Sequence, residues 1–219
     1  MPVDPLELRS GTVAVAIRAA RLIAVLRRVE PRPRLLALVD DLAADGIRIF
    51  EITFDGADAA ADLASVRAHL GPQAGDRNGP TIQVGAGTIR TPDQLRAALD
   101  AGAEFAVSPV LDQPILEAAL AAGLPFVAGA YTPTEADRAW RAGATFVKVF
   151  PASSLGPDHI RELRGPLPEI ETIVTGGIDG ANAAAFLAAG AAAVGVGSAL
   201  ERMSSSERRA LVAAVRSER

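Results

Sequence analysis

The stretch from Ala101 to Phe150 has the sequence AGAEFAVSPVLDQPILEAALAAGLPFVAGAYTPTEADRAWRAGATFVKVF. Three of its Ala-Gly pairs recur at a regular spacing, with glycines at positions 102, 123 and 143, so the intervals are 21 and 20 residues. Each pair precedes a short apolar run, as expected where a helix ends and a parallel strand begins. The βα unit is therefore itself the repeat, and repeated βα units predict a parallel sheet covered by helices.

The same alternation extends along the whole chain and predicts eight strands. We expect them near residues 21–26, 48–53, 81–85, 104–107, 125–129, 145–150, 170–175 and 192–196. With seven intervening helices and a terminal helix at about 198–216, the α/β fold is a (β/α)8 TIM barrel, and residues 1–219 form a single domain. The first twenty residues predict an extra N-terminal helix. The alternative is an open doubly wound sheet, but no glycine-rich dinucleotide fingerprint follows the first strand.

Local signals mark the ends of the predicted helices. Glycines at 46, 102, 123, 143 and 190 stand where a helix would end, because glycine adopts the left-handed cap conformation at little cost. Thr91 and Thr132 each precede a proline and predict helix N-caps. The segment 71–80 is the expected flexible loop.

Composition narrows the classes of partner. The chain has 219 residues, a net charge of −4 and no basic patch, so neither nucleic acid nor an anionic membrane is an expected partner. Cysteine is absent, and His69 and His159 fall on distant predicted helices, so we expect no metal site. No segment has the pattern of an export signal or a membrane span, which makes the cytoplasm the expected location.

Lys148 is the only lysine among the 22 basic residues. Only an amine can lose its proton and condense with a carbonyl, which an arginine cannot do. In residues 145–150 the β-branched side chains share the face suited to packing under helices, so Phe146, Lys148 and Phe150 would point into the barrel. A desolvated amine there could attack a ketone, and the resulting iminium is an electron sink for carbon–carbon bond cleavage or formation. No organic cofactor is then needed.

Two further charged side chains are predicted to enter the barrel. The alternation in residues 49–54 places Glu51 inside, and Arg27 ends the first strand on the face of Ile23 and Val25. These charged groups could serve catalysis, or Glu51 and Lys148 could form an ion pair with a purely structural role. Buried ion pairs add little net stability, which argues against the structural role. We therefore favour catalysis, with Glu51 as the group that moves protons.

Glycine-rich segments end the last two predicted strands. Thr175-Gly176-Gly177 ends the seventh strand and Gly195-Val196-Gly197-Ser198 ends the eighth. The loops after these strands of a barrel commonly bind phosphate through backbone N–H groups. Alternatively, these two glycine-rich segments form tight turns that bind no ligand.

Taken together, these segments resemble the 2-keto-3-deoxy-6-phosphogluconate aldolase and 4-hydroxy-2-oxoglutarate aldolase family along nearly the whole chain. The matching segments are Ile23–Arg27, Glu51–Phe54, Val84–Thr88, Val107–Pro109, Lys148–Ala152, Thr175–Ile178 and Gly195–Leu200. The resemblance implies a homotrimeric class I aldolase. Its substrate would be a 2-keto-3-deoxy-6-phosphogluconate-type or 4-hydroxy-2-oxo acid, cleaved to pyruvate and either glyceraldehyde 3-phosphate or glyoxylate.

The resemblance also implies residue roles. Lys148 would form the Schiff base and Glu51 would be the acid/base. Arg27 and Thr88 would bind the pyruvate carboxylate. Pro109 and Phe150 would line the pocket. The phosphate would be bound by Gly176, Gly177 and Ser198.

The chain departs from the family pattern at several positions. Asp55 stands where many members carry an arginine that holds the acid end of the substrate, and Arg27 would substitute for that arginine. The other departures are Val110, Val174, Tyr131 and the pair Ser153-Ser154.

Two other functions fit the same residues. A phosphosugar isomerase or epimerase of this fold would use Glu51 as a base without covalent catalysis. A non-catalytic phosphate-ligand-binding barrel is the second, and Asp55 is its best support. Borohydride distinguishes the aldolase from both, because it traps only an iminium.

Overall fold

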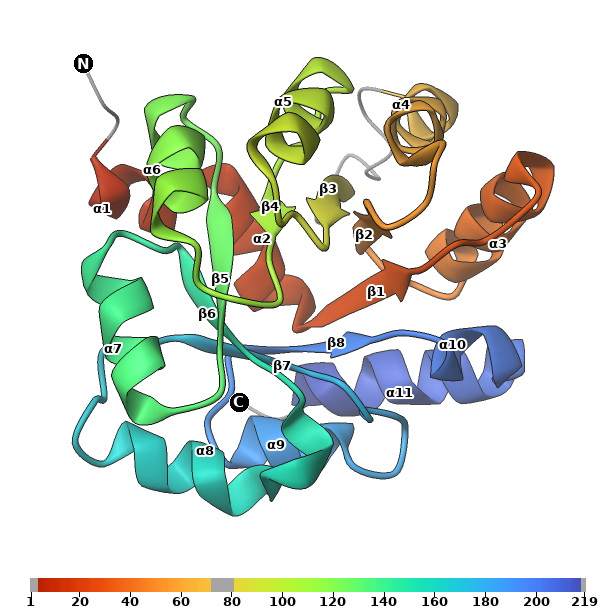
Figure 1. The fold of residues 1–219 in the computed structure, drawn as a ribbon. Helices are drawn as coiled ribbons and strands as arrows, with labels where there is room; N and C mark the ends of the chain where they lie inside the picture. The colour runs from red at the N-terminus through yellow and green to blue at the C-terminus, as the bar shows by residue number, and fades with distance from the viewer. Residues whose placement is uncertain (1–3, 72–80, 218–219) are drawn as a thin grey trace.

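The computed structural model describes residues 4–71 and 81–217. Its eight parallel strands pair in chain order and close into a ring when β1 pairs with β8 (Figure 1). This confirms the (β/α)8 barrel, and the open sheet is wrong. The strands are β1 (Leu22–Leu26), β2 (Ile49–Thr53), β3 (Gln83–Gly87), β4 (Ala106–Val107), β5 (Phe126–Ala130), β6 (Phe146–Val149), β7 (Thr172–Thr175) and β8 (Ala193–Val196).

Helices surround this ring of strands, as Figure 1 shows. They are α3 (Arg32–Ala44), α4 (Ala59–Leu70), α5 (Pro92–Asp100), α6 (Gln113–Ala121), α7 (Pro133–Arg141), α8 (Gly156–Arg164), α9 (Ala183–Ala188), α10 (Ala199–Arg202) and α11 (Ser205–Ser217), with a 3-10 turn η1 (Ala152–Ser154) before α8. Thr91 and Thr132 cap α5 and α7 in capping boxes, as predicted. The five glycines predicted at helix ends all have positive φ, between +71° and +105°.

Two helical segments differ from the prediction. The terminal helix expected at 198–216 is divided into α10 and α11, because Met203 is extended and a new helix begins at Ser205. The Ser204 backbone N–H and hydroxyl both donate to Glu207, at 2.7 Å each, which is a helix-start contact. The N-terminal helix is likewise divided at Gly11 into α1 (Pro5–Ser10) and α2 (Thr12–Ala20). Residues 72–80 of the predicted loop 71–80 lie outside the described residues.

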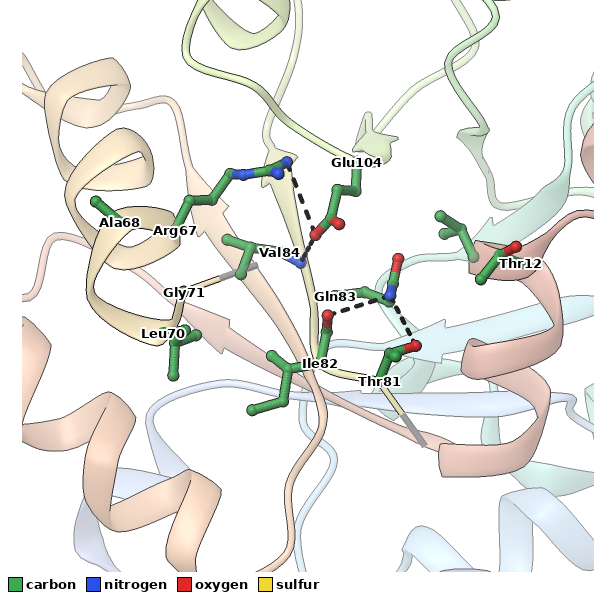
Figure 2. Close-up of a pocket in the computed structure, with 11 residues that line it drawn as sticks. Thr12, Arg67, Ala68, Leu70, Gly71, Thr81, Ile82, Gln83, Val84 and Glu104 are labelled. Atoms are coloured by element: carbon green, nitrogen blue, oxygen red, sulfur yellow. Dashed lines mark hydrogen bonds and ion pairs between the residues drawn. The ribbon is translucent and has the colours of Figure 1, made fainter. Parts of the chain in front are cut away.

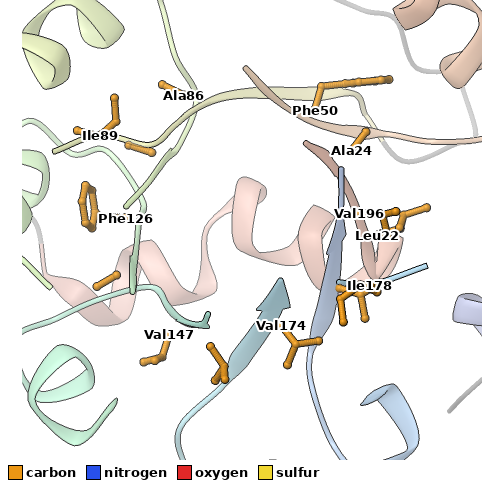
Figure 3. Close-up of a cluster of buried hydrophobic side chains, with 14 of the residues drawn as sticks. Leu22, Ala24, Phe50, Ala86, Ile89, Phe126, Val147, Val174, Ile178 and Val196 are labelled. Atoms are coloured by element: carbon orange, nitrogen blue, oxygen red, sulfur yellow. The ribbon is translucent and has the colours of Figure 1, made fainter. Parts of the chain in front are cut away.

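The apolar side chains form two layers separated by the strands. The outer layer lies under the helices and includes alternate residues such as Phe50 of β2 and Val147 of β6 (Figure 3). The inner layer fills the barrel and includes Ile23, Ile49 and Phe146. The inward and outward faces predicted for β1, β2 and β6 are therefore confirmed.

The helix α2 closes the end of the barrel at which the strands begin. Its Ala14, Ile17 and Ala20 are buried against the inner apolar layer. Arg18 on the same helix forms an ion pair with Glu171, just before β7, with Nη2 and Oε2 2.7 Å apart. Within the described residues, α2 thus covers the barrel interior at the end opposite the carboxyl ends of the strands. No helix within the described residues is long and apolar enough to cross a membrane.

This arrangement predicts unequal costs for two truncations on α2. Ile17 is 1% exposed, so Ile17→Ala should lower the free energy of unfolding by about 2–5 kcal/mol through lost burial and a cavity. Val15 on the same helix is 54% exposed, so Val15→Ala should change the free energy of unfolding by no more than about 0.5 kcal/mol. Urea unfolding of both variants measures the difference. Equal costs would contradict the packing of α2 into the barrel.

Candidate active site

Lys148 and Glu51 face each other across the barrel axis. Their strands, β6 and β2, stand four places apart in a ring of eight, so inward side chains from the two strands meet in the middle. Lys148 Nζ lies 3.9 Å from Glu51 Oε1, and the two side chains are 6% and 1% exposed. Within the described residues Glu51 Oε1 has no hydrogen-bond partner. A buried amine and a buried carboxylate are thus held together without saturating each other.

Glycine residues in the two neighbouring strands allow close approaches around this pair. A Cβ on Gly87 of β3 would lie 1.9 Å from Glu51 Oε1, so only glycine fits beside the carboxylate. Gly129 of β5 is the register partner of Lys148, and a Cβ on it would lie 2.1 Å from the carbonyl carbon of Pro109. Glycines inside strands are the sequence signal of such close approaches. Gly129 brings the loop after β4 against β5, the strand that pairs with the strand of Lys148.

The loops after β1, β2 and β3 form a charged cluster at the mouth of the barrel. Arg27 Nη1 lies 2.6 Å from Asp55 Oδ2, and Arg27 Nη2 donates to Thr88 Oγ1 at 3.3 Å. Arg28 Nε lies 3.2 Å from the same Asp55 oxygen. Burial alone would raise the pKa of Asp55, but hydrogen bonds from Thr53 and Arg27 and the Arg27 charge outweigh it. The pKa of Asp55 therefore lies below its ordinary value.

The glycine-rich ends of β7 and β8 lie side by side at the same mouth, because Thr175 pairs with Gly195. Gly176 and Gly177 have φ of +90° and +75°, a conformation that side chains disfavour. A Cβ on Gly177 would also lie 2.5 Å from Ser153 Cβ of η1. Ser198 precedes α10, and its hydroxyl accepts a hydrogen bond from Arg202 at 3.1 Å.

A cavity of about 530 Å³ opens beside the end of β6 and includes Pro109 and Phe150 in its lining. The Phe150 ring centroid lies 5.3 Å from Lys148 Nζ. Tyr131 lines the same cavity, and its phenol oxygen is 3.3 Å from Ser154 Oγ. Val110 also lines this cavity, whereas Val174 points outward into the layer under the helices.

A larger cavity, of about 620 Å³, lies at the opposite end of the barrel (Figure 2). It contains an Arg67–Glu104 ion pair of 3.8 Å, and Glu104 also accepts the Val84 backbone N–H at 2.7 Å. Gly71 and Thr81 both line it, and the chain between them lies outside the described residues. We assign no role to this cavity. In residues 4–71 and 81–217, no three His, Asp or Glu side chains gather as a metal site would require.

The site residues named from the sequence lie at or just beyond the carboxyl ends of strands, except Glu51, which is the central residue of β2. The structure links them by contact in two groups, Lys148 with Glu51 and Phe150, and Arg27 with Thr88. Gly87 and Gly129 were missed as site residues, although glycines within a strand signal a close approach.

A buried lysine beside a carboxylate inside a (β/α)8 barrel is the arrangement that a Schiff-base lyase of the aldolase class requires. The chain belongs to the KDPG and KHG aldolase family, whose model matches residues 13–215.

Relatives in other organisms support this membership. The chain is 32% identical over 189 residues to the 2-dehydro-3-deoxy-6-phosphogalactonate aldolase of Escherichia coli K12, covering 86% of this chain and 88% of that one. It is 33% identical over 187 residues to the 2-dehydro-3-deoxy-phosphogluconate aldolase of Pseudomonas aeruginosa, covering 84% and 79%. It is also similar to the crystal structure of KDPG aldolase from Legionella pneumophila, in which pyruvate was captured as a covalent carbinolamine intermediate. The TM-score is 0.74 at 25% identity, covering 92% and 95%.

The close approach of Gly87 to Glu51 predicts a strong effect on catalysis. Gly87→Ala should lower kcat for aldol cleavage by about 100-fold or more, because the new methyl group displaces the carboxylate. Gly180→Ala is the control, since its Cβ would make only an ordinary 3.4 Å contact with Met203. Circular dichroism establishes that both variants fold. A folded Gly87→Ala variant with unchanged kcat would show that Glu51 placement is irrelevant to turnover.

Proposed function

We propose that this chain is a class I aldolase that cleaves a 2-keto-3-deoxy-6-phospho sugar acid to pyruvate and glyceraldehyde 3-phosphate through an imine on Lys148. The observation that supports the proposal most directly is the buried Lys148–Glu51 pair, with its amine and carboxylate 3.9 Å apart. An amine in an apolar interior is disposed to add to a ketone, and a nearby carboxylate can move the protons that imine formation requires.

The proposed reaction begins when the neutral Lys148 amine adds to the C2 carbonyl of the substrate. The carbinolamine loses water to give an iminium. The C3–C4 bond then breaks as the C4 hydroxyl loses its proton, so C4 leaves as the aldehyde and the electron pair forms an enamine. The enamine gains a proton at C3, and water hydrolyses the imine to pyruvate and free Lys148. Glu51 gives a proton to the departing hydroxyl of the carbinolamine, accepts the C4 hydroxyl proton as the C3–C4 bond breaks, and donates it to C3 of the enamine.

The two ends of the substrate would bind on different strand ends. We place the carboxylate against Arg27 and Thr88, which contact each other after β1 and β3. Pro109 and Phe150 would line the pocket beside the reacting carbons. The phosphate would lie against the loops after β7 and β8, where the backbone N–H groups of Gly176 and Gly177 and the hydroxyl of Ser198 are donors.

The names of the relatives support the sugar-acid assignment. The two relatives are named as aldolases of 2-dehydro-3-deoxy-6-phosphogalactonate and of 2-dehydro-3-deoxy-phosphogluconate. A 4-hydroxy-2-oxo acid that releases glyoxylate is the other substrate of the family. The reaction chemistry is the same for both, because only the group beyond C4 differs.

We also propose that the chain forms a homotrimer, as the resemblance implies. Light scattering should then give three times the 22.6 kDa of one chain. The expected cytoplasmic location stays a prediction.

Borohydride trapping tests the imine. Incubation with pyruvate and sodium borohydride should add one reduced pyruvyl group, and peptide mapping should place it on Lys148. Intact-mass spectrometry followed by digestion measures this. The chain suits the experiment because Lys148 is its only lysine, so mapping has to distinguish it only from the N-terminal amine.

Lys148→Arg is the matched control, since it keeps a positive charge and removes the nucleophile. We expect no adduct on this variant and no measurable cleavage. A folded wild-type chain without an adduct at saturating pyruvate would contradict the proposed function. It would favour the isomerase or the ligand-binding barrel.

Glu51→Gln tests the proton-transfer role separately. The amide keeps the size of the side chain but cannot exchange a proton, so kcat for aldol cleavage should fall by about 10² to 10⁴-fold. Steady-state kinetics under the wild-type conditions measures the loss. A Glu51→Gln variant with wild-type kcat would assign proton transfer to another group.

A further inference from the structure

Asp55 is the centre of an ion-pair cluster at the mouth of the barrel. Its Oδ2 atom receives two guanidinium groups, with Arg27 Nη1 at 2.6 Å and Arg28 Nε at 3.2 Å. Arg28 also donates to the Asp55 backbone carbonyl at 3.0 Å, which holds the main chain of the loop as well. Asp55 is 19% exposed, whereas Arg27 is 51% exposed. The carboxylate is thus the partly buried anchor and the guanidinium of Arg27 is the accessible end.

The bonding of Arg27 leaves donors available on its exposed side. Nη1 is bonded to Asp55 and Nη2 to Thr88, so one N–H on each of these nitrogens is used. A guanidinium has five N–H groups, which leaves three for a ligand. Because its fork is planar, fixing two nitrogens also fixes the plane in which a carboxylate can bind in bidentate fashion.

The net charge of the cluster also suits an anion. Two arginines and one aspartate sum to one positive charge, so the cluster still attracts a carboxylate although it contains Asp55. An unpaired aspartate beside an anionic substrate would repel it. The ion pairs at 2.6 and 3.2 Å turn the same group into a support for the arginine.

We infer that Asp55 is a positioning residue, which holds the Arg27 guanidinium against Thr88 in the orientation that receives the carboxylate of the 2-oxo acid. The inference rests on the proposed function, because it takes Arg27 and Thr88 as the carboxylate site. Asp55 contributes affinity for the carboxylate end of the substrate and acts on it only through Arg27. The competing interpretation is that Asp55 occupies the anion site itself and has to be displaced.

The first test uses the sign of a change in KM. Simple removal of a negative charge near an anionic substrate would lower KM, and removal of a competitor would do the same. Loss of positioning raises it, and we expect Asp55→Ala to raise KM for 2-keto-3-deoxy-6-phosphogluconate about tenfold, with a smaller change in kcat. The control is Asp58→Ala, which removes an exposed charge from the same loop and leaves KM unchanged or slightly lower. Asp58 makes no ion pair within the described part of the chain.

The second test separates carboxylate recognition from general damage to the site. Pyruvate and acetone both form an imine with an amine, but only pyruvate has a carboxylate. Asp55→Ala should raise the pyruvate concentration for half-maximal borohydride trapping about tenfold and leave acetone trapping unchanged. Asp55→Asn, which keeps an oxygen acceptor for Arg27, should restore part of the loss. In an Arg27→Met background, Asp55→Ala should have no further effect.

The outcomes are distinguishable. A wild-type chain that traps no pyruvate would overturn the proposed function and this inference with it. A wild-type chain that traps pyruvate, together with an Asp55→Ala variant of unchanged or lower KM, would overturn the inference alone. Equal losses with pyruvate and acetone, or additive effects with Arg27→Met, would also overturn it, because they indicate a structural role.

Discussion

The site depends on one constraint, which is that a carboxylate and an amine share a closed apolar interior. Burying either charge alone would cost several kcal/mol, so each is retained only because the other lies within reach. Closure of the barrel brings β2 and β6 to opposite sides of one axis, and the Glu51–Lys148 distance of 3.9 Å follows from that closure. The fold thus brings the pair together. A gain in the stability of the folded state explains the pair poorly, because buried ion pairs add little net stability.

The small residues of the neighbouring strands follow from the same constraint. Gly87 lies against the carboxylate of Glu51, and Gly129 brings Pro109 against β5, the strand that pairs with that of Lys148. Helix α2 covers one end of the interior in the described part of the chain, and the opposite end, where the strands finish, is the open one. The charged cluster of Arg27, Arg28 and Asp55 lies at this open end, where a polar group can remain partly hydrated.

Local patterns predicted some elements well and others poorly. The capping threonines and the helix-ending glycines were correct because their chemistry is local to a few residues. The third strand was expected at 81–85 and runs from Gln83 to Gly87, two residues further along. Its glycines disfavour strand structure locally but are required by contacts with Phe105 and Glu51, which come from distant parts of the chain. The division between α10 and α11 was missed although Ser204 and Glu207 carry its signal.

The sequence by itself determined the class of fold, the inward faces of β1, β2 and β6, and the choice of Lys148 as the one amine. These follow from the period of two along a strand and from residue chemistry, neither of which needs a second segment. Only the tertiary structure decided the bonding of Asp55, which stood in the sequence as a departure from the arginine that many family members carry. Its effect depends on whether a guanidinium from another strand end lies within hydrogen-bonding distance. The Asp55 carboxylate lies 2.6 Å from Arg27 and is therefore paired. The energy of an electrostatic interaction depends on the distance between the charges, and between distant segments only the tertiary structure fixes that distance.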